Sequence, residues 1–527
     1  MKRKSLVIII SGVVALVLLV LLLIPVALEP WAKNKIENKF KGTDQDYLLD
    51  IGKLDISIIK PGVELENLTL FSKQEKEGIP VLQGEIASFR IKGVKLLKAL
   101  FRQDLEIFEV IISDIRITGK FAFAEKAVNA KISPLNMTID RLILDNLSLD
   151  IKSDSTAQAF MVSDGFIYFK NLKVEKYDTL SLAILKRFEL DAVELRTVSP
   201  DSLYTVSASG INYSDASNTL SVSNFAIIPN YSEYEFTSRH QFESDRFEAE
   251  LSQVSFHGFS AEDFIQSGNL KSSYIEIGEI QMKAFRDKRE EFRHVDKPTF
   301  QELIYSYPGT IDIDSVGILN GSITYTEHAE GANEPGMIRF DELKALIYNI
   351  SNDSVYKTKE AYLEMKAEAL LMGKGKANVF LKARLFEKEN TFEVLGTLSA
   401  MEAMEMNPIL EKNAFLYVTS GNIESMNFSF TANNTRATGN MQLNYEGMNL
   451  TIKNKHTDDT TAFKERFISM IANMKIMDSN PMPGEGIRIG TIDYERDPEK
   501  FLFNYFVKSI MSGITSSLIK DPQESKK

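Results

Sequence analysis

The side chains best suited to catalysis or metal binding are few in this sequence, and their spacing matches no site motif. There is no cysteine, which excludes thiolate zinc sites, cysteine nucleophiles and disulfides. The sequence has no zinc-binding helix motif, nucleophile elbow, phosphate loop or glycine-rich dinucleotide fingerprint. The histidines lie far apart without metal-ligand spacing, at His240, His257, His294, His328 and His456. We therefore expect no catalytic residue, metal or cofactor, and a protein that is not an enzyme.

Asp312 and Asp314 come closest to a ligand pair. They lie within a stretch of alternating apolar residues, so in a strand both carboxylates would point to one outward face. The remaining ligands of a calcium loop do not follow them. A solvated outer face is therefore the better interpretation. The net charge of −12, spread along the chain, likewise argues against a nucleic-acid partner, which would favour a basic surface.

An eight-residue pattern of apolar, x, apolar, x, x, apolar, x, apolar predicts the strands that would position these residues. Two copies follow one another at Leu49–Ile56 and Val63–Leu70. Period-two alternation indicates a strand with one apolar face, and the doubled polar step returns the chain to that face, as a β-bulge or tight bend would. Later copies begin at Val110, Leu142, Ile167, Phe188, Val206, Leu220, Ile275, Ile311, Ile338 and Leu443.

The pattern predicts a mainly β protein with a long, bent, repetitive antiparallel sheet that is apolar on one face. Something must cover that face. An internal helix or second sheet would make an ordinary core, whereas lipid would make a groove, and the pattern alone does not distinguish them. The candidate groove-lining residues are Leu54, Ile56, Leu65, Leu68, Ile112, Ile115, Leu144, Leu147, Leu190, Val193, Ile277, Ile280, Ile313 and Val316.

The N-terminus predicts a membrane anchor. A basic tail precedes an apolar run from Leu6 to Leu28, which as a helix would span about 34 Å, enough for a bilayer core. This is longer than a signal-peptide core, so we expect a retained anchor. The short basic tail favours a cytoplasmic N-terminus, although lysines just beyond the run weaken the asymmetry. The lone tryptophan, Trp31, would lie at the membrane interface.

The rest of the chain divides by composition. We expect a cytoplasmic tail and anchor over 1–28, a β region over 29–282, a charged linker or helix over 283–300, a second β region over 301–456 and a helical region over 457–527. Helical spacing favours helices within 29–46, 92–101, 401–410, 461–477 and 501–518. The last of these is amphipathic. It could pack on its own domain, cover an open end of the sheet or lie on a membrane surface.

Several stretches resemble a known family. After the anchor come Tyr47–Ile56 and Pro61–Leu70, then a strand, short helix and strand over Ile86–Ile112. Asn407–Leu410, Ser420–Met426 and Ala437–Leu443 are similar to the family's closing strands. This order is similar to that of AsmA-like envelope proteins, the group that includes AsmA, TamB and YhdP. The likeness extends over about 30–120 and 390–452, and the middle matches in style only.

The resemblance implies an inner-membrane protein, anchored through residues 6–28, with its body in the periplasm of a diderm bacterium. It implies a bent sheet whose concave apolar face holds phospholipid or other acyl-chain lipids, in outer-membrane lipid transport and biogenesis. One alternative is an envelope structural or outer-membrane protein assembly factor that acts on other envelope proteins through sheet edges. A surface adhesin or stalk fits the anchor less well.

Overall fold

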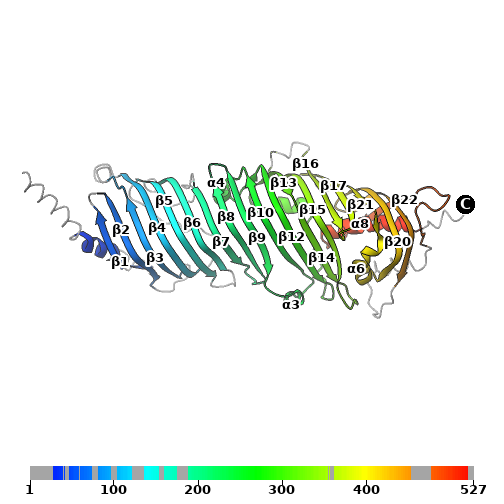
Figure 1. Ribbon diagram of the computed structural model, residues 1–527, viewed down its shortest axis with the longest axis horizontal. Coiled ribbons are helices and arrows are strands. Elements are labelled where there is room, and N and C mark those ends of the chain that lie inside the picture. Colours follow the sequence, from blue (N-terminus) through cyan, green and yellow to red (C-terminus); the bar gives the residue numbers. More distant parts are fainter. Residues whose placement is uncertain are drawn as a thin grey trace, which may run out of the picture. The chain divides into compact units, whose positions relative to one another are not determined.

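The computed structural model in Figure 1 describes residues 28–38, 41, 47–57, 60–73, 81–95, 104–121, 136–153, 159–174, 188–353, 355, 361–452 and 476–519. The chain divides into two compact units, Met1–Ser223 and Asn224–Lys527. The predicted anchor lies outside the described residues except for Leu28. Within those ranges no helix is long and apolar enough to cross a membrane.

The N-terminal unit is built from strands that pair in chain order. They are β1 (Tyr47–Ser57), β2 (Gly62–Ser72), β3 (Val81–Lys92), β4 (Asp104–Phe121), β5 (Asn136–Ser153), β6 (Ala159–Val174), β7 (Phe188–Val198) and β8 (Tyr204–Ser214). β9 (Thr219–Pro229) spans the boundary between the units. The predicted mainly β architecture is confirmed.

The C-terminal unit begins with α3 (Glu233–Ser238), β10 (Asp245–His257), α4 (Ala261–Ser267), β11 (Leu270–Ser272), β12 (Tyr274–Asp287) and α5 (Phe300–Tyr305). Its sheet continues through β13 (Ile311–Ile318), β14 (Gly321–His328), β15 (Gly336–Ser351), β16 (Tyr362–Leu371), β17 (Gly375–Arg384), β18 (Phe392–Leu398) and β19 (Met401–Glu402). Short helical turns over 403–414, including α6 (Asn407–Ile409), precede β20 (Leu416–Ala432), β21 (Arg436–Ile452), β22 (Ile489–Glu495) and α8 (Leu502–Leu518).

The expectation of a wholly antiparallel sheet is wrong, because the strands form a mixed sheet. β4 and β5 run parallel along their whole length, and β12 runs parallel to both β13 and β14. A parallel step needs a crossover of about a dozen residues or more, and the chain between Phe121 and Asn136 is long enough. The eight-residue pattern, or octet, could not reveal this step, because it indicates which face of a strand is apolar and not the direction of the neighbouring strand.

The octets do encode bends. In six of them the fifth residue has a positive φ: Asn67, Asp114, Asn146, Gly210, Glu342 and Gly447, with φ from 51° to 64°. Such left-handed residues occur in bulges, where they break the alternation of faces. In β4 and β5 the pairing passes from Ser113 with Asp145 to Ile115 with Leu147, leaving out Asp114 and Asn146. The Asn146 Nδ2 donates a 2.6 Å hydrogen bond to the Asp114 Oδ1 across these two bends.

Other octets have the bend in the paired strand. Gln253 of β10, with φ of 52°, lies opposite Gly278 in the octet of β12. Likewise Asn67 of β2 lies opposite Gly52 in the octet of β1. A Cβ on Gly52 would lie 2.9 Å from the Cβ of Asn67, and one on Gly278 would lie 2.9 Å from that of Gln253. The glycine therefore makes room for the bent neighbour.

The edge of β1 is covered by a helix over residues 28–38, the described part of the helix expected within 29–46. The Ile51 N–H donates to the Glu37 Oε1 at 3.1 Å, and the Ile56 N–H donates to the Glu29 Oε1 at 3.0 Å. The Lys33 Nζ donates to the Gly52 carbonyl at 3.3 Å. Three side chains at helical i, i+4 spacing thus satisfy the open backbone groups of an edge strand.

The other helix predictions have mixed outcomes. The helix expected over 501–518 is confirmed as α8, and the helical segment at 401–410 consists of the short turns over 403–414. The helix expected over 461–477 lies outside the described residues apart from 476–477, which are not helical. Of 92–101, only 92–95 are described, and they are the end of β3 and a non-helical segment.

The charged stretch 283–300 is neither a linker nor an exposed helix. Residues 283–287 complete β12, and 288–299 form a loop that contacts residues 496–501, where the Lys297 N–H donates to the Pro498 carbonyl at 2.7 Å. The boundary between the compact units instead falls within β9. Composition signalled a charged surface loop there, and such a loop can be fixed by partners distant in sequence.

Candidate functional site

The candidate site is the apolar face of the bent sheet, which we define by the apolar residues of the octets and those paired with them. In the N-terminal unit the strand register aligns these residues. Ile115 of β4 lies opposite Ile86 of β3 and Leu147 of β5, and Ile112 lies opposite Phe89 and Leu144. The octets therefore bring the predicted residues of neighbouring strands to the same level of one face.

Burial on this face of the N-terminal unit varies along each strand. Ile51 and Leu54 flank the bend of β1 and are 0% and 5% exposed, whereas Leu49 and Ile56 at the two ends of the octet are half-buried. The same gradient holds in β2, where Leu65 and Leu68 are buried and Val63 and Leu70 are half-buried. It does not hold in β4 and β5. There the buried residues include Ile115 and Leu147 beside the bends and also Ile107, Val110, Ile139 and Ile151 on the arms, whereas the half-buried ones are Ile112, Ile117, Leu144 and Leu149. The face therefore combines buried side chains with half-buried ones that remain partly accessible to a ligand.

Most predicted residues join this face, and one does not. Ile56, Ile112 and Leu144 are half-buried, and the backbone of Leu190 pairs with Ile167 and Tyr213. Val193 is 56% exposed. The pairing of β7 skips Val193 itself, passing from Ala192 with Gly165 to Glu194 with Ser163, so the octet read from Phe188 is out of phase with the real bulge.

The predicted residues of the C-terminal unit occupy β12 and β13. Ile313 is buried, and Ile277, Ile280 and Val316 are half-buried. Ile277 lies opposite Val254 of β10 and Ile318 of β13. The described ranges contain no group of three or more His, Asp or Glu side chains that could hold a metal ion.

One end of the C-terminal face is closed by α8. Phe392, Val394, Met441 and Ile492 are at most 2% exposed in a core that also contains Phe506 of α8. The rings of Phe392 and Phe506 stack with centroids 5.2 Å apart. At this end the apolar face is covered by a helix and forms an ordinary protein core. A helix or sheet was one of the two kinds of cover that the octet pattern allowed, and lipid was the other.

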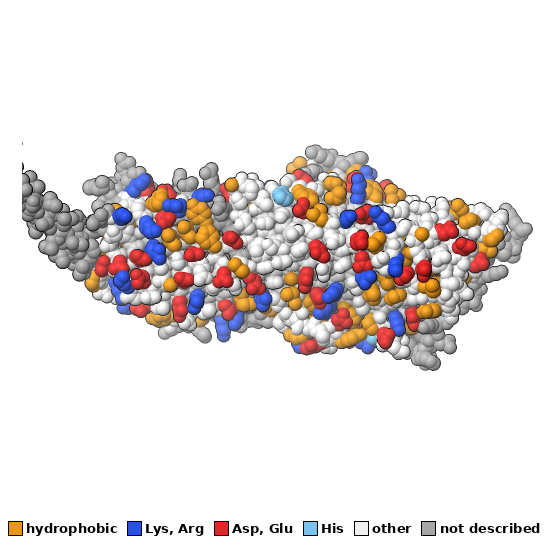
Figure 2. All heavy atoms as spheres, in the orientation of Figure 1, with side chains coloured by type: hydrophobic (Ala, Val, Ile, Leu, Met, Phe, Trp, Pro, Cys, Tyr) orange, Lys and Arg blue, Asp and Glu red, His pale blue; other side chains and the backbone are white. Residues whose placement is uncertain are grey.

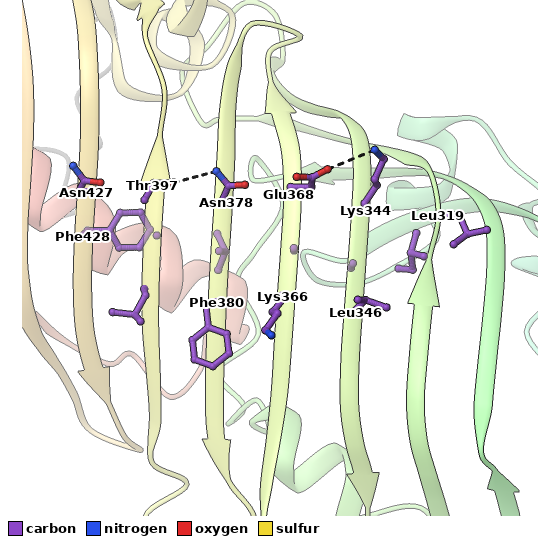
Figure 3. Close-up of a pocket in the computed structure, with 16 residues that line it drawn as sticks. Leu319, Lys344, Leu346, Lys366, Glu368, Asn378, Phe380, Thr397, Asn427 and Phe428 are labelled. Carbon is purple, nitrogen blue, oxygen red and sulfur yellow. Dashed lines mark hydrogen bonds and ion pairs between the residues drawn. The ribbon is translucent and has the colours of Figure 1, made fainter.

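The opposite face of β15 to β18 and β20 carries an open hollow of about 850 Å³, which sequence reasoning missed (Figure 3). Ala345, Ala367, Val379, Gly396 and Phe428 lie in register along its middle. Val379 and Phe428 belong to the α8-covered core, so the residues next to them in each strand point away from it. Those residues form two rows that border the hollow.

The two rows differ in polarity. One holds Lys344, Glu368, Asn378, Thr397 and Asn427, and the other holds Leu346, Lys366, Phe380 and Leu395 (Figure 3). Glu368 pairs with Lys376 at 2.9 Å and with Lys344 at 3.5 Å, and the hydrogen bond from Lys376 lowers the pKa of its carboxyl. Leu346 and Leu395 are 41% and 52% exposed. An apolar surface rimmed by polar residues can mark a ligand groove or a protein contact.

Charged side chains are scattered over the face drawn in Figure 2, in agreement with a solvated outer face. Comparison with known proteins adds no family: no protein-family model matches the chain, and no curated protein is detectably similar to it.

Proposed function

We propose that the chain is a non-enzymatic lipid-binding or lipid-transfer protein of the bacterial envelope, related to the AsmA-like proteins. Acyl chains would lie against the half-buried residues of the apolar face. Residues 6–28 would anchor the protein in the inner membrane, with the body in the periplasm, where it would contribute to outer-membrane lipid homeostasis.

One observation carries this proposal: on the apolar face of the N-terminal unit, half-buried residues lie side by side in register, Ile112 with Leu144 and Ile117 with Leu149. Each methylene group that moves from water onto such a surface contributes about 0.8 kcal/mol. About ten methylenes would therefore contribute about 8 kcal/mol before the entropy of binding is subtracted. Affinity of this kind needs no catalytic residue.

The test is lipid extraction and mass spectrometry of the purified full-length chain, with two matched variants in β4. Ile117 is half-buried on the apolar face, and its neighbour Arg116 is exposed on the other. Ile117→Glu should reduce bound lipid several-fold, whereas Arg116→Glu should leave it unchanged. Absence of lipid from the wild-type chain, or equal loss in both variants, would contradict the proposal.

The hollow of Figure 3 supports a second candidate, an envelope structural or assembly factor that acts through protein contacts. Leu346 and Leu395 would supply the contact surface, and the charged row beside them would orient the partner. This candidate predicts that Leu395→Lys abolishes co-purification of an envelope protein. A chain without lipid but with such a partner would favour it over lipid transfer.

A further inference from the structure

A pocket of about 560 Å³ lies at one end of β10 and β12 in the C-terminal unit. Three segments distant in sequence form it: residues 240–247, 286–297 and 499–501. The Glu243 N–H donates to the Glu291 carbonyl at 2.8 Å, and the His294 Nδ1 lies 2.9 Å from the Glu499 Oε2. These contacts fix the three segments to one another, so the pocket is formed by the fold and not by one loop.

Phenylalanine rings and cations line this pocket together. The Arg293 guanidinium lies 6.0 Å from the ring centre of Phe242, and the Lys297 ammonium lies 5.0 Å from that of Phe501. Among the residues that the structure describes, no carboxylate forms an ion pair with Arg293 or Lys297. Arg286 differs, since Asp245 accepts two hydrogen bonds from it, both of 2.7 Å. Two lining cations thus keep their charge available to a ligand.

Cations and carboxylates lie together at this pocket, with Glu243, Asp245 and Glu499 in its lining. Burial lowers the pKa of Lys500, and the nearby cations Lys288 and Arg286 lower it further against the opposing effect of Glu243. Burial raises the pKa of Glu243, whose Oε2 is buried without a hydrogen-bond partner. An anion in the pocket would offset the repulsion among the cations.

The pocket lies at the end of the apolar face. Arg286 and Asp245 are paired across β12 and β10, followed two residues along by Ala284 with Phe247 and then by Met282 with Ala249. Alternation places these three pairs on one face, the face of the octet residues Ile280 and Met282. An apolar surface that ends in a cationic pocket matches the two parts of an anionic amphiphile.

We propose that this pocket binds the phosphate group of an amphiphile through Arg293 and Lys297, while the acyl chains lie along the adjoining apolar face. This proposal deepens the proposed function and rests on it for the acyl chains. A free phosphate ion would use the same cations, so the test must separate the two sources.

The test measures binding of fluorescent phosphatidic acid and of diacylglycerol with the same acyl chains to the full-length protein. Wild-type protein should bind the phosphatidic acid about tenfold more tightly. The double variant Arg293→Gln/Lys297→Gln should lose this preference and keep its affinity for diacylglycerol. The control is Lys283→Gln, at an exposed lysine of β12 that pairs with Glu248 at 2.9 Å; it should behave as wild type.

Inorganic phosphate, followed by phosphorus NMR, provides the second readout. If neither lipid binds but phosphate binds to wild type and not to the double variant, the pocket is a site for free phosphate and the amphiphile proposal is overturned together with the proposed function. If both lipids bind equally to wild type, the headgroup site is overturned while lipid binding stands. Unchanged preference in the double variant also overturns the assignment to Arg293 and Lys297.

Discussion

The apolar face of the sheet has two different environments in this chain. Across β18, β21 and β22 it is closed by α8, and its central side chains are at most 2% exposed. Across β1 to β5 buried residues such as Ile51 and Val110 share the face with half-buried ones such as Leu49 and Ile117. The same octet grammar occurs in both regions, at Leu443 as at Val63. The octet pattern therefore produces an apolar face, and whether that face becomes a closed core depends on a separate segment that covers it.

The closure by α8 depends on small residues. Ser509, Gly513 and Ser517 are buried on one side of the helix, and a Cβ on Gly513 would lie 2.7 Å from the Ile492 Cγ1 and 3.1 Å from the Met441 Cβ. The helix can approach β21 and β22 because these side chains are short. In the described part of the N-terminal unit the corresponding helix, 28–38, covers only the edge strand β1 and its neighbour β2.

The largest expected difference between the two regions comes from deleting a phenylalanine ring in each. Phe392→Ala should cost about 3–5 kcal/mol of unfolding free energy, because a fully buried ring leaves a cavity that α8 cannot fill. Phe89→Ala should cost about 1–2 kcal/mol, since its ring is only half-buried. Urea unfolding followed by peptide-level hydrogen exchange would resolve the two units. Equal costs would refute the contrast between a closed and a partly open face.

The edge of β1 gives the next effect. Glu37→Leu removes a buried carboxylate and leaves the Ile51 N–H unpaired, with an expected loss of about 1–3 kcal/mol near β1. Amide exchange at Ile51 should accelerate, and the uncovered edge should promote association between chains. Asn34→Leu, at an exposed position of the same helix, is the control. Unchanged exchange at Ile51 would show that the helix does not protect the edge.

A smaller effect tests the bends that both regions share. Asn146→Val places a β-branched residue in a left-handed conformation and removes the hydrogen bond to Asp114, at a cost of about 1–2 kcal/mol. Asn146→Gly loses the same hydrogen bond but adopts this conformation freely, so it should cost less than Asn146→Val. Thermal unfolding of the pair decides the matter, and equal destabilisation by both substitutions would mean that φ is not the cause.

The smallest effect has the opposite sign. Glu342 has φ of 51°, so Glu342→Gly should stabilise the C-terminal unit by about 0.5–1 kcal/mol. Glu393, exposed in the regular strand β18, provides the matched site where glycine should destabilise by a similar amount. Denaturant midpoints of the two variants should therefore move in opposite directions. Movement in the same direction would show that the positive φ of Glu342 does not determine the effect of glycine there.

Much of this architecture could be predicted from residues. The doubled polar step at Asp145 and Asn146 located a real bulge, and the apolar spacing of Phe506 and Ile510 located α8. The phase of an octet could not be fixed where apolar residues crowd together, as at Val193. The cationic pocket was also beyond prediction, because its residues come from segments that only the tertiary fold brings together.

The central claim, that acyl chains lie on the half-buried residues of the apolar face, is tested most directly by photo-crosslinking along β5. A photoreactive residue would replace Leu142, Leu144, Leu147 or Leu149 on the apolar face, or Asp145 or Ser148 on the other, in the full-length protein. The account predicts lipid adducts at the half-buried Leu142, Leu144 and Leu149, few at the buried Leu147, and none at Asp145 or Ser148. Adducts on both faces, or none at the leucines, would contradict it.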